Sequence, residues 1–106
     1  MVQRCKVILT TVGPYGKYGA ALVAACVKHT THYCDLAGEV PWMRQMIETH
    51  HDAARANGTK IVHTCGFDSV PSDMGVFYTQ QQIIAKTGRP ASMINMRVKA
   101  LSLIHI

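Results

Sequence analysis

The sequence predicts an α/β fold in which a parallel sheet is connected by crossover helices. Short runs rich in β-branched, aromatic or aliphatic residues lie at 6–11, 32–35 and 60–65. A helix-like stretch separates each run from the next, and glycine or proline follows each run closely. Strand, helix, strand, helix, strand in this order is typical of right-handed crossovers between parallel strands.

The first half of the chain supports three of these elements. Residues 6–11 form a β-branched run that ends before a Gly-Pro pair, which predicts a buried strand. Residues 18–29 are mostly good helix formers, and they end in Lys-His, where cations suit the negative end of a helix dipole. Residues 32–35 predict a second short strand.

The second half continues the alternation. A helix is predicted from Pro41, which suits a first turn, to the Asn57-Gly58 stop. Residues 60–65 predict the third strand, and 70–86 a third helix. Residues 92–100 alternate weakly between polar and apolar side chains, which predicts a fourth strand with one wet face, in a different sheet.

Composition narrows the classes of function. The chain has 106 residues, 48% of them hydrophobic and 16% charged, and a net charge of +5. Its basic residues are scattered, whereas nucleic-acid binding needs a clustered basic face, so no nucleic-acid partner is predicted. The longest apolar run has eight residues, 20–27, too short for the ~20 that a membrane span requires.

The cysteines and histidines give no metal site. The four cysteines form no CxxC pair, which favours a reducing, intracellular compartment. His50 and His51 are adjacent, so on a helix they face different ways, and the other histidines lack a partner at ligand spacing. Cys65 ends a strand, where a reactive thiol is conceivable, but a buried packing role is favoured.

Three glycine-containing motifs directly follow the predicted strands. The carboxyl ends of parallel strands share one edge of a sheet, and open α/β sheets bind ligands there, so the motifs are expected to converge. Glu39 could cap the helix that it precedes or bond a ribose hydroxyl; Asp68 and Ser69 could cap the third helix or contact a phosphate. The candidate ligand-binding residues are Val12, Gly13, Pro14, Tyr15, Gly38, Glu39, Gly66, Phe67, Asp68 and Ser69.

One expected motif is missing. The glycine-rich GxGxxG turn that holds a dinucleotide pyrophosphate follows none of the strands.

These motifs resemble those of a known family. Val12-Gly13-Pro14-Tyr15, Thr31-His32-Tyr33-Cys34-Asp35 to Gly38-Glu39, and Cys65-Gly66-Phe67-Asp68-Ser69-Val70-Pro71-Ser72-Asp73 are similar to motifs of the saccharopine dehydrogenase-like oxidoreductases, a family that includes the trans-acting enoyl reductases of bacterial lipid synthesis. The resemblance runs from about residue 5 to 90. Thr30-Thr31 departs from it, because the family often has a glycine before His-Tyr.

The resemblance implies a domain organisation. Residues 1–90 would be the C-terminal part of a Rossmann-like domain without its glycine-rich first half, and 91–100 the start of a second α/β domain. The chain would then be a fragment, with Met1 an internal methionine. Residues 101–106 resemble a translated sequencing adapter and are expected to lie outside the fold.

The resemblance also implies a chemistry: hydride transfer with NADP or NAD, on a small-molecule or lipid substrate of lipid or glycolipid metabolism. The ten candidate residues would lie along the cofactor, with no catalytic residue assigned. The alternative is a non-catalytic Rossmann-like protein associated with lipid droplets, mitochondria or a membrane. In either case the fragment alone is expected to bind no cofactor tightly, because the pyrophosphate-binding turn is missing.

Overall fold

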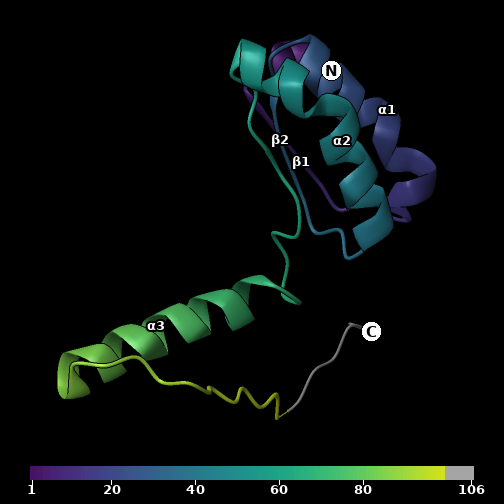
Figure 1. Ribbon diagram of the computed structural model, residues 1–106. Coiled ribbons are helices and arrows are strands. Elements are labelled where there is room, and N and C mark those ends of the chain that lie inside the picture. The colour runs from purple at the N-terminus through teal and green to yellow at the C-terminus, as the bar shows by residue number, and fades with distance from the viewer. Residues whose placement is uncertain (100–106) are drawn as a thin grey trace. The chain divides into compact units, whose positions relative to one another are not determined.

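The structure is a computed structural model and describes residues 1–99 (Figure 1). It confirms the α/β class. The elements are a short 3-10 helix η1 (Val2–Arg4), β1 (Val7–Thr10), α1 (Tyr15–Lys28), β2 (His32–Asp35), α2 (Val40–Asn57), β3 (Ile61–Val62) and α3 (Val70–Thr87). The adapter-like residues 101–106 lie outside the described residues.

The three strands form one parallel sheet in the order β1-β2-β3, as the sequence predicts. In the register, Val7 lies opposite His32, and Tyr33 lies opposite Ile61. Each neighbouring pair of strands is therefore joined by one crossover helix, α1 or α2. This part of the chain is the type of half-sheet found in Rossmann-like folds.

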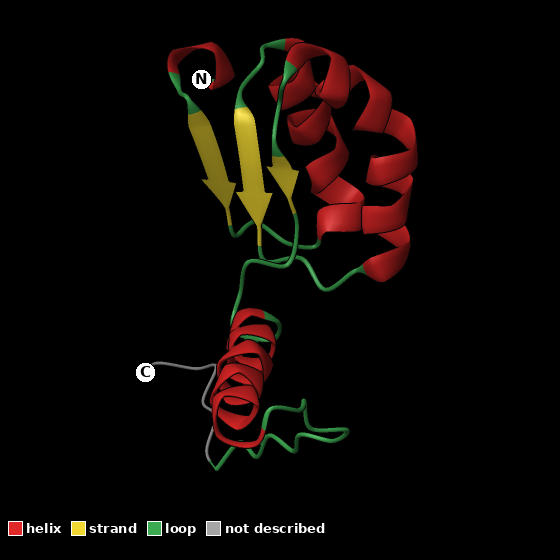
Figure 2. Ribbon diagram, turned by 60° about the vertical axis from the view of Figure 1, so that its left-hand side comes forward, coloured by secondary structure: helices red, strands yellow, loops and turns green. Residues whose placement is uncertain are grey.

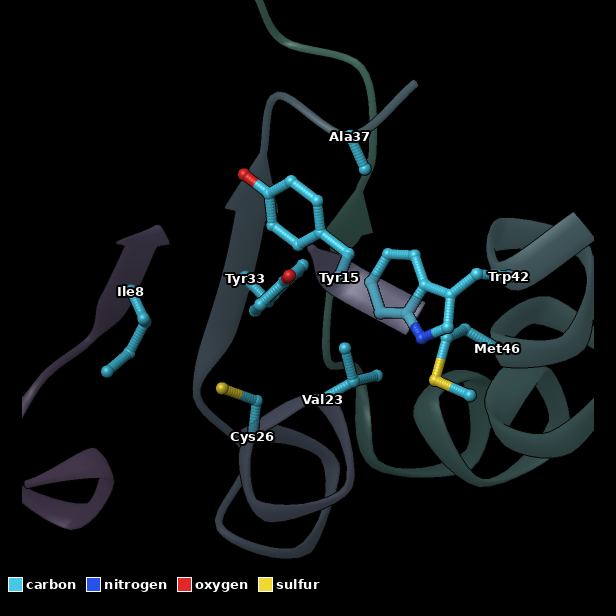
Figure 3. Close-up of a cluster of buried hydrophobic side chains, with 8 residues drawn as sticks. All are labelled: Ile8, Tyr15, Val23, Cys26, Tyr33, Ala37, Trp42 and Met46. Atoms are coloured by element: carbon cyan, nitrogen blue, oxygen red, sulfur yellow. The ribbon is translucent and has the colours of Figure 1, made fainter. Parts of the chain in front are cut away.

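Both crossover helices lie on the same side of the sheet (Figure 2). The core fills the space between them and the strands, with Tyr33 1% exposed and Val23 fully buried. Figure 3 shows this cluster of eight residues: Ile8, Tyr15, Val23, Cys26, Tyr33, Ala37, Trp42 and Met46.

The opposite face of the sheet is open within the described residues. Side chains alternate along a strand, so Val7 and Leu9 point away from the helices, and they are 55% and 71% exposed. Val62 on β3 is likewise 52% exposed. The first strand was predicted to be buried; the structure covers only the side that carries Ile8.

The helices differ from prediction mainly at the start of α1. It begins at Tyr15 rather than residue 18, with Pro14 as its N-cap residue. Helix α2 begins at Val40, one residue before the predicted Pro41, and stops at Gly58, whose φ of 76° is left-handed. Glycine tolerates that conformation without steric cost, so the predicted stop is confirmed.

Residues 71–99 belong to a second compact unit. Helix α3 ends near Gly88, and the Gln80 side-chain amide pairs with the backbone of Ala91 in both directions, at 2.8 and 2.9 Å. The predicted fourth strand is wrong for residues 92–99, which contain no strand. Weak alternation does not make a strand unless a neighbouring strand is present to hydrogen-bond its backbone.

None of the helices among the described residues combines the length and the apolar character that crossing a bilayer demands.

Candidate functional site

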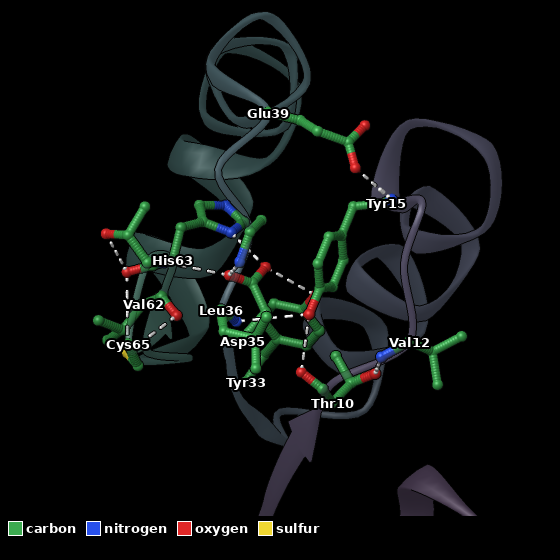
Figure 4. A network of polar contacts seen from close by, with 12 residues as sticks. Thr10, Val12, Tyr15, Tyr33, Asp35, Leu36, Glu39, Val62, His63 and Cys65 are labelled. Atoms are coloured by element: carbon green, nitrogen blue, oxygen red, sulfur yellow. Dashed lines mark hydrogen bonds and ion pairs between the residues drawn. The ribbon is translucent and has the colours of Figure 1, made fainter. Parts of the chain in front are cut away.

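The segments after β1, β2 and β3 meet at one edge of the sheet (Figure 4). We call residues 11–14, 36–39 and 63–69 the carboxyl-edge loops. The Cys65 backbone N–H donates to the Asp35 carbonyl at 2.7 Å, which continues the β2–β3 pairing beyond β3. A Cβ on Gly66 would lie 2.8 Å from the Leu36 Cβ, so the second and third loops are in close contact.

Asp35 is the centre of a buried polar network at this edge. Its carboxylate side chain is fully buried and accepts four hydrogen bonds. Oδ2 accepts from the Tyr33 hydroxyl at 2.9 Å and contacts His63 Nδ1 at 2.7 Å. Oδ1 accepts from the backbone amides of Ala37 and Thr64 at 3.0 and 3.1 Å. One carboxylate therefore fixes the start of two carboxyl-edge loops.

His63 is oriented by this carboxylate. A carboxylate can only accept, so the Nδ1 atom of His63 donates its hydrogen to Asp35. Within the described residues Nε2 is buried and has no hydrogen-bond partner, as is also true of Trp42 Nε1. The two rings are in edge contact, with centroids 5.2 Å apart. His63 therefore lies in the packing between β3 and α2.

Glu39 links the first and second loops. Its two carboxylate oxygens accept hydrogen bonds from the backbone amides of Tyr15 at 2.6 Å and Gly16 at 2.9 Å. These are the first amides of α1. Glu39 makes no side-chain cap bond to α2, the helix that it precedes. The prediction that it caps its own helix is wrong, because the amides of the neighbouring helix are within its reach.

Tyr15 belongs to the core. It is 4% exposed, and its ring stacks on Trp42 with centroids 5.4 Å apart. Its hydroxyl donates to the Thr10 carbonyl at 3.0 Å and accepts from the Leu36 amide at 3.4 Å. Of the ten predicted site residues, Tyr15 and Glu39 are thus in contact with each other. Tyr15 packs in the core, and Glu39 links two of the loops.

The other predicted residues border the edge. Val12 and Phe67 are 63% and 50% exposed. The Gly66 carbonyl accepts from the amides of Ser69 and Val70, so the chain turns into α3 through backbone bonds. That Asp68 or Ser69 caps α3 stays a prediction. Gly13, Pro14, Gly38 and Asp68 are exposed, and Gly66 and Ser69 are half-buried.

Burial raises the pKa values of two side chains at this edge, Tyr33 and Cys65. Burial raises the pKa of the Tyr33 phenol strongly, and the hydrogen bond and negative charge of Asp35 raise it further. Desolvation, and then the neighbouring Cys34 and Asp35, raise the pKa of the Cys65 thiol. Cys65 is exposed rather than buried as predicted. A raised pKa lowers the fraction of reactive thiolate, so its environment does not activate it.

A groove of about 580 Å³ lies beside the network, between α2 and β3. Met46, Ile47 and Ile61 contribute apolar side chains to its lining, and Arg55 and Lys60 contribute positively charged ones. Among residues 1–99, no three histidine, cysteine, aspartate or glutamate side chains gather in a way that could hold a metal ion.

The Asp35–His63 pair escaped the sequence analysis. In the register Tyr33 lies opposite Ile61, and two residues further on Asp35 meets His63 on the same face. The signal was the matching alternation at the ends of two adjacent parallel strands. It becomes visible only once the strands are aligned with each other.

The fold and site define a class: a parallel α/β half-sheet of the Rossmann-like type, with loops gathered at its carboxyl edge. The chain is 50% identical over 84 residues to a trans-acting enoyl reductase of Mycobacterium leprae, covering 79% of this chain and 20% of that protein. It is 53% identical over 77 residues to a putative trans-acting enoyl reductase of Mycobacterium tuberculosis strain H37Rv, covering 73% of this chain and 18% of that protein.

A trans-acting enoyl reductase of Mycobacterium ulcerans is 53% identical over 78 residues, covering 74% of this chain and 19% of that protein. The chain thus spans about a fifth of the length of these curated relatives. No protein-family model matches it, and no solved structure matches it either.

Proposed function

We propose that this chain forms part of the cofactor side of an NAD(P)-dependent oxidoreductase that reduces the enoyl group of a lipid-linked substrate. The observation that carries the proposal is the identity of about half the residues, over more than 70% of the chain, with proteins named trans-acting enoyl reductases. The wider assignment to the saccharopine dehydrogenase-like family is part of the same proposal and rests on the motifs.

The carboxyl-edge loops fit a dinucleotide. Open α/β sheets bind ligands at this edge, and Val12 and Phe67 expose apolar side chains there that suit the face of a nicotinamide or a ribose. A Cβ on Gly38 would meet nothing within 4 Å, so the second loop leaves room for a ligand. When bound, the nicotinamide supplies the hydride.

The chain's own residues would position that cofactor. Gly13, Pro14 and Gly38 would offer backbone close to the ligand, and Gly66, Phe67, Asp68 and Ser69 would border its nicotinamide side. Tyr15 is buried and Glu39 is bonded to backbone amides, so they would hold the loops in place rather than touch the ligand.

A chimera tests the proposal. In the Mycobacterium leprae relative, the stretch that matches this chain is replaced by the corresponding 84 residues of this chain. We expect NADPH consumption with a 2-enoyl thioester within about tenfold of the parent's, a difference of about 1.4 kcal/mol in the barrier. A chimera that folds, as judged by circular dichroism, but oxidises no NADPH while the parent does would contradict the proposal and favour a non-catalytic role.

A further inference from the structure

We infer that Glu39 is a positioning residue: its carboxylate, in place of any ligand phosphate, is the anion held at the N-terminus of α1. The inference refines the proposed function, because it specifies which part of a dinucleotide can lie beside the first carboxyl-edge loop. It concerns only the chain's own contacts, so it can be tested without cofactor or substrate.

The geometry is that of a filled anion site. The first amides of a helix have no partner within the helix, and together with the helix dipole they favour a negative charge. Here the Tyr15 and Gly16 amides each donate to a different oxygen of Glu39, at 2.6 and 2.9 Å. Charge-assisted bonds of this kind are among the stronger hydrogen bonds in proteins.

The fit depends on Gly16. A Cβ at this position would lie 2.9 Å from Glu39 Oε2, so a larger residue would push the carboxylate off the amides. Glu39 comes from the segment between β2 and α2, 23 residues along the chain from Gly16. The two motifs, Gly-Pro-Tyr-Gly and Gly-Glu, are therefore the two halves of one contact.

The contact determines how a dinucleotide could lie. A pyrophosphate needs free amides, and those at the start of α1 are taken. The first loop then presents Val12 and the Gly13-Pro14 backbone, which can contact a sugar or a ring but do not supply a phosphate cradle. The pyrophosphate has to be held elsewhere.

Amide chemical shifts of the isotopically labelled 106-residue chain test the inference. In the wild type, the Tyr15 and Gly16 amide shifts should follow the titration of one carboxylate and should not respond to inorganic phosphate at neutral pH. Glu39→Gln, which keeps the side chain's size, should abolish the pH response. Glu48→Gln is the matched control, because Glu48 is exposed and pairs only with Arg44 among the described residues, so the response should persist.

Two results would overturn the inference. One is a saturable phosphate response of the wild-type Tyr15 and Gly16 amides, which would show that a phosphate displaces Glu39. The other is an unchanged pH response in Glu39→Gln, which would show that another group faces these amides. Because neither result depends on NADPH or on reduction, failure here is distinct from failure of the chimera.

Discussion

The residue that organises the carboxyl edge is Asp35. A buried carboxylate with four hydrogen bonds supports the ends of two strands, and each of its neighbours would lose a partner without it. Buried polar groups left unpaired are costly, which makes this position more sensitive than an apolar core position of similar size.

Substitution of Asp35 should reveal this cost. Asp35→Ala should lower the free energy of unfolding by about 3–5 kcal/mol, because it leaves Tyr33, His63 and two backbone amides without their hydrogen-bond acceptor. Asp35→Asn should cost less, about 1–3 kcal/mol, because its amide oxygen can still accept from the two backbone amides. Urea unfolding of the chain measures both. Asp52→Ala, at an exposed position of α2, is the control, and an equal effect there would refute the central role of Asp35.

The raised pKa of the Tyr33 phenol predicts that the free energy of unfolding falls at alkaline pH. Its pKa is raised in the folded state, whereas in an unfolded chain a tyrosine ionises near pH ~10. The folded state keeps a proton that the unfolded state loses, so this stabilisation is complete below pH ~10 and declines above it, by about 1.4 kcal/mol per pH unit. Unfolding at pH ~9 and ~11 should show a steeper loss for the wild type than for Tyr33→Phe; parallel losses would contradict this.

Thr30 carries backbone strain. Its φ of 54° is left-handed, which is unfavourable for a β-branched residue and natural for glycine. Thr30→Gly should therefore raise the free energy of unfolding by about 0.5–1 kcal/mol, the relief of strain less the entropy lost by glycine. The next residue is a matched contrast, because Thr31 is 2% exposed and its hydroxyl donates to the Val2 carbonyl. Thr31→Gly should destabilise the chain, and a gain from it would count against this explanation.

At the scale of elements, α1 and α2 meet where Gly19 faces Trp42. A Cβ on Gly19 would lie 2.5 Å from the Trp42 Cζ2 atom, within the ring. Trp42 also contacts Tyr15 and His63, so it cannot move without disturbing the core and the edge.

Gly19→Ala should thus destabilise the chain by about 1–3 kcal/mol through overpacking, even though alanine favours helix. Gly75→Ala in α3 is the control, because a Cβ there would meet nothing within 4 Å; helix propensity should make it neutral or stabilising by up to about 1 kcal/mol. Thermal unfolding of both variants compares them, and equal shifts in Tm would show that the two helices are not tightly packed.

The order of elements could be predicted because each strand and helix has its own local pattern, such as the β-branched run before Gly13 and the stop at Gly58. The start of α1 at Tyr15 could not be predicted, since the Tyr15 amide finds its hydrogen-bond acceptor in a carboxylate 24 residues away. The same limit hid the Asp35–His63 pair, which exists only through strand register. The fourth strand failed because periodicity does not supply a neighbouring strand.

At the scale of the whole molecule, the proposed function assigns to this sheet half of a dinucleotide site. The chain contributes three parallel strands and the loops at their carboxyl edge, but its sequence contains no GxGxxG turn. Much of the affinity for a dinucleotide comes from its pyrophosphate on such a turn. The exposed apolar side chains Val7, Leu9 and Val62 on the open face fit a sheet that packs against further polypeptide.

Calorimetric titration with NADPH, of the 106-residue chain and of the chimera side by side, measures whether the carboxyl-edge loops border a cofactor. We expect the remaining sequence of the chimera to supply the pyrophosphate site, and therefore expect saturable binding in the micromolar range to the chimera and no saturable binding to the chain alone. Micromolar binding to the chain alone would show that its loops form a complete site, and a folded chimera that binds no NADPH would show that they border no cofactor at all.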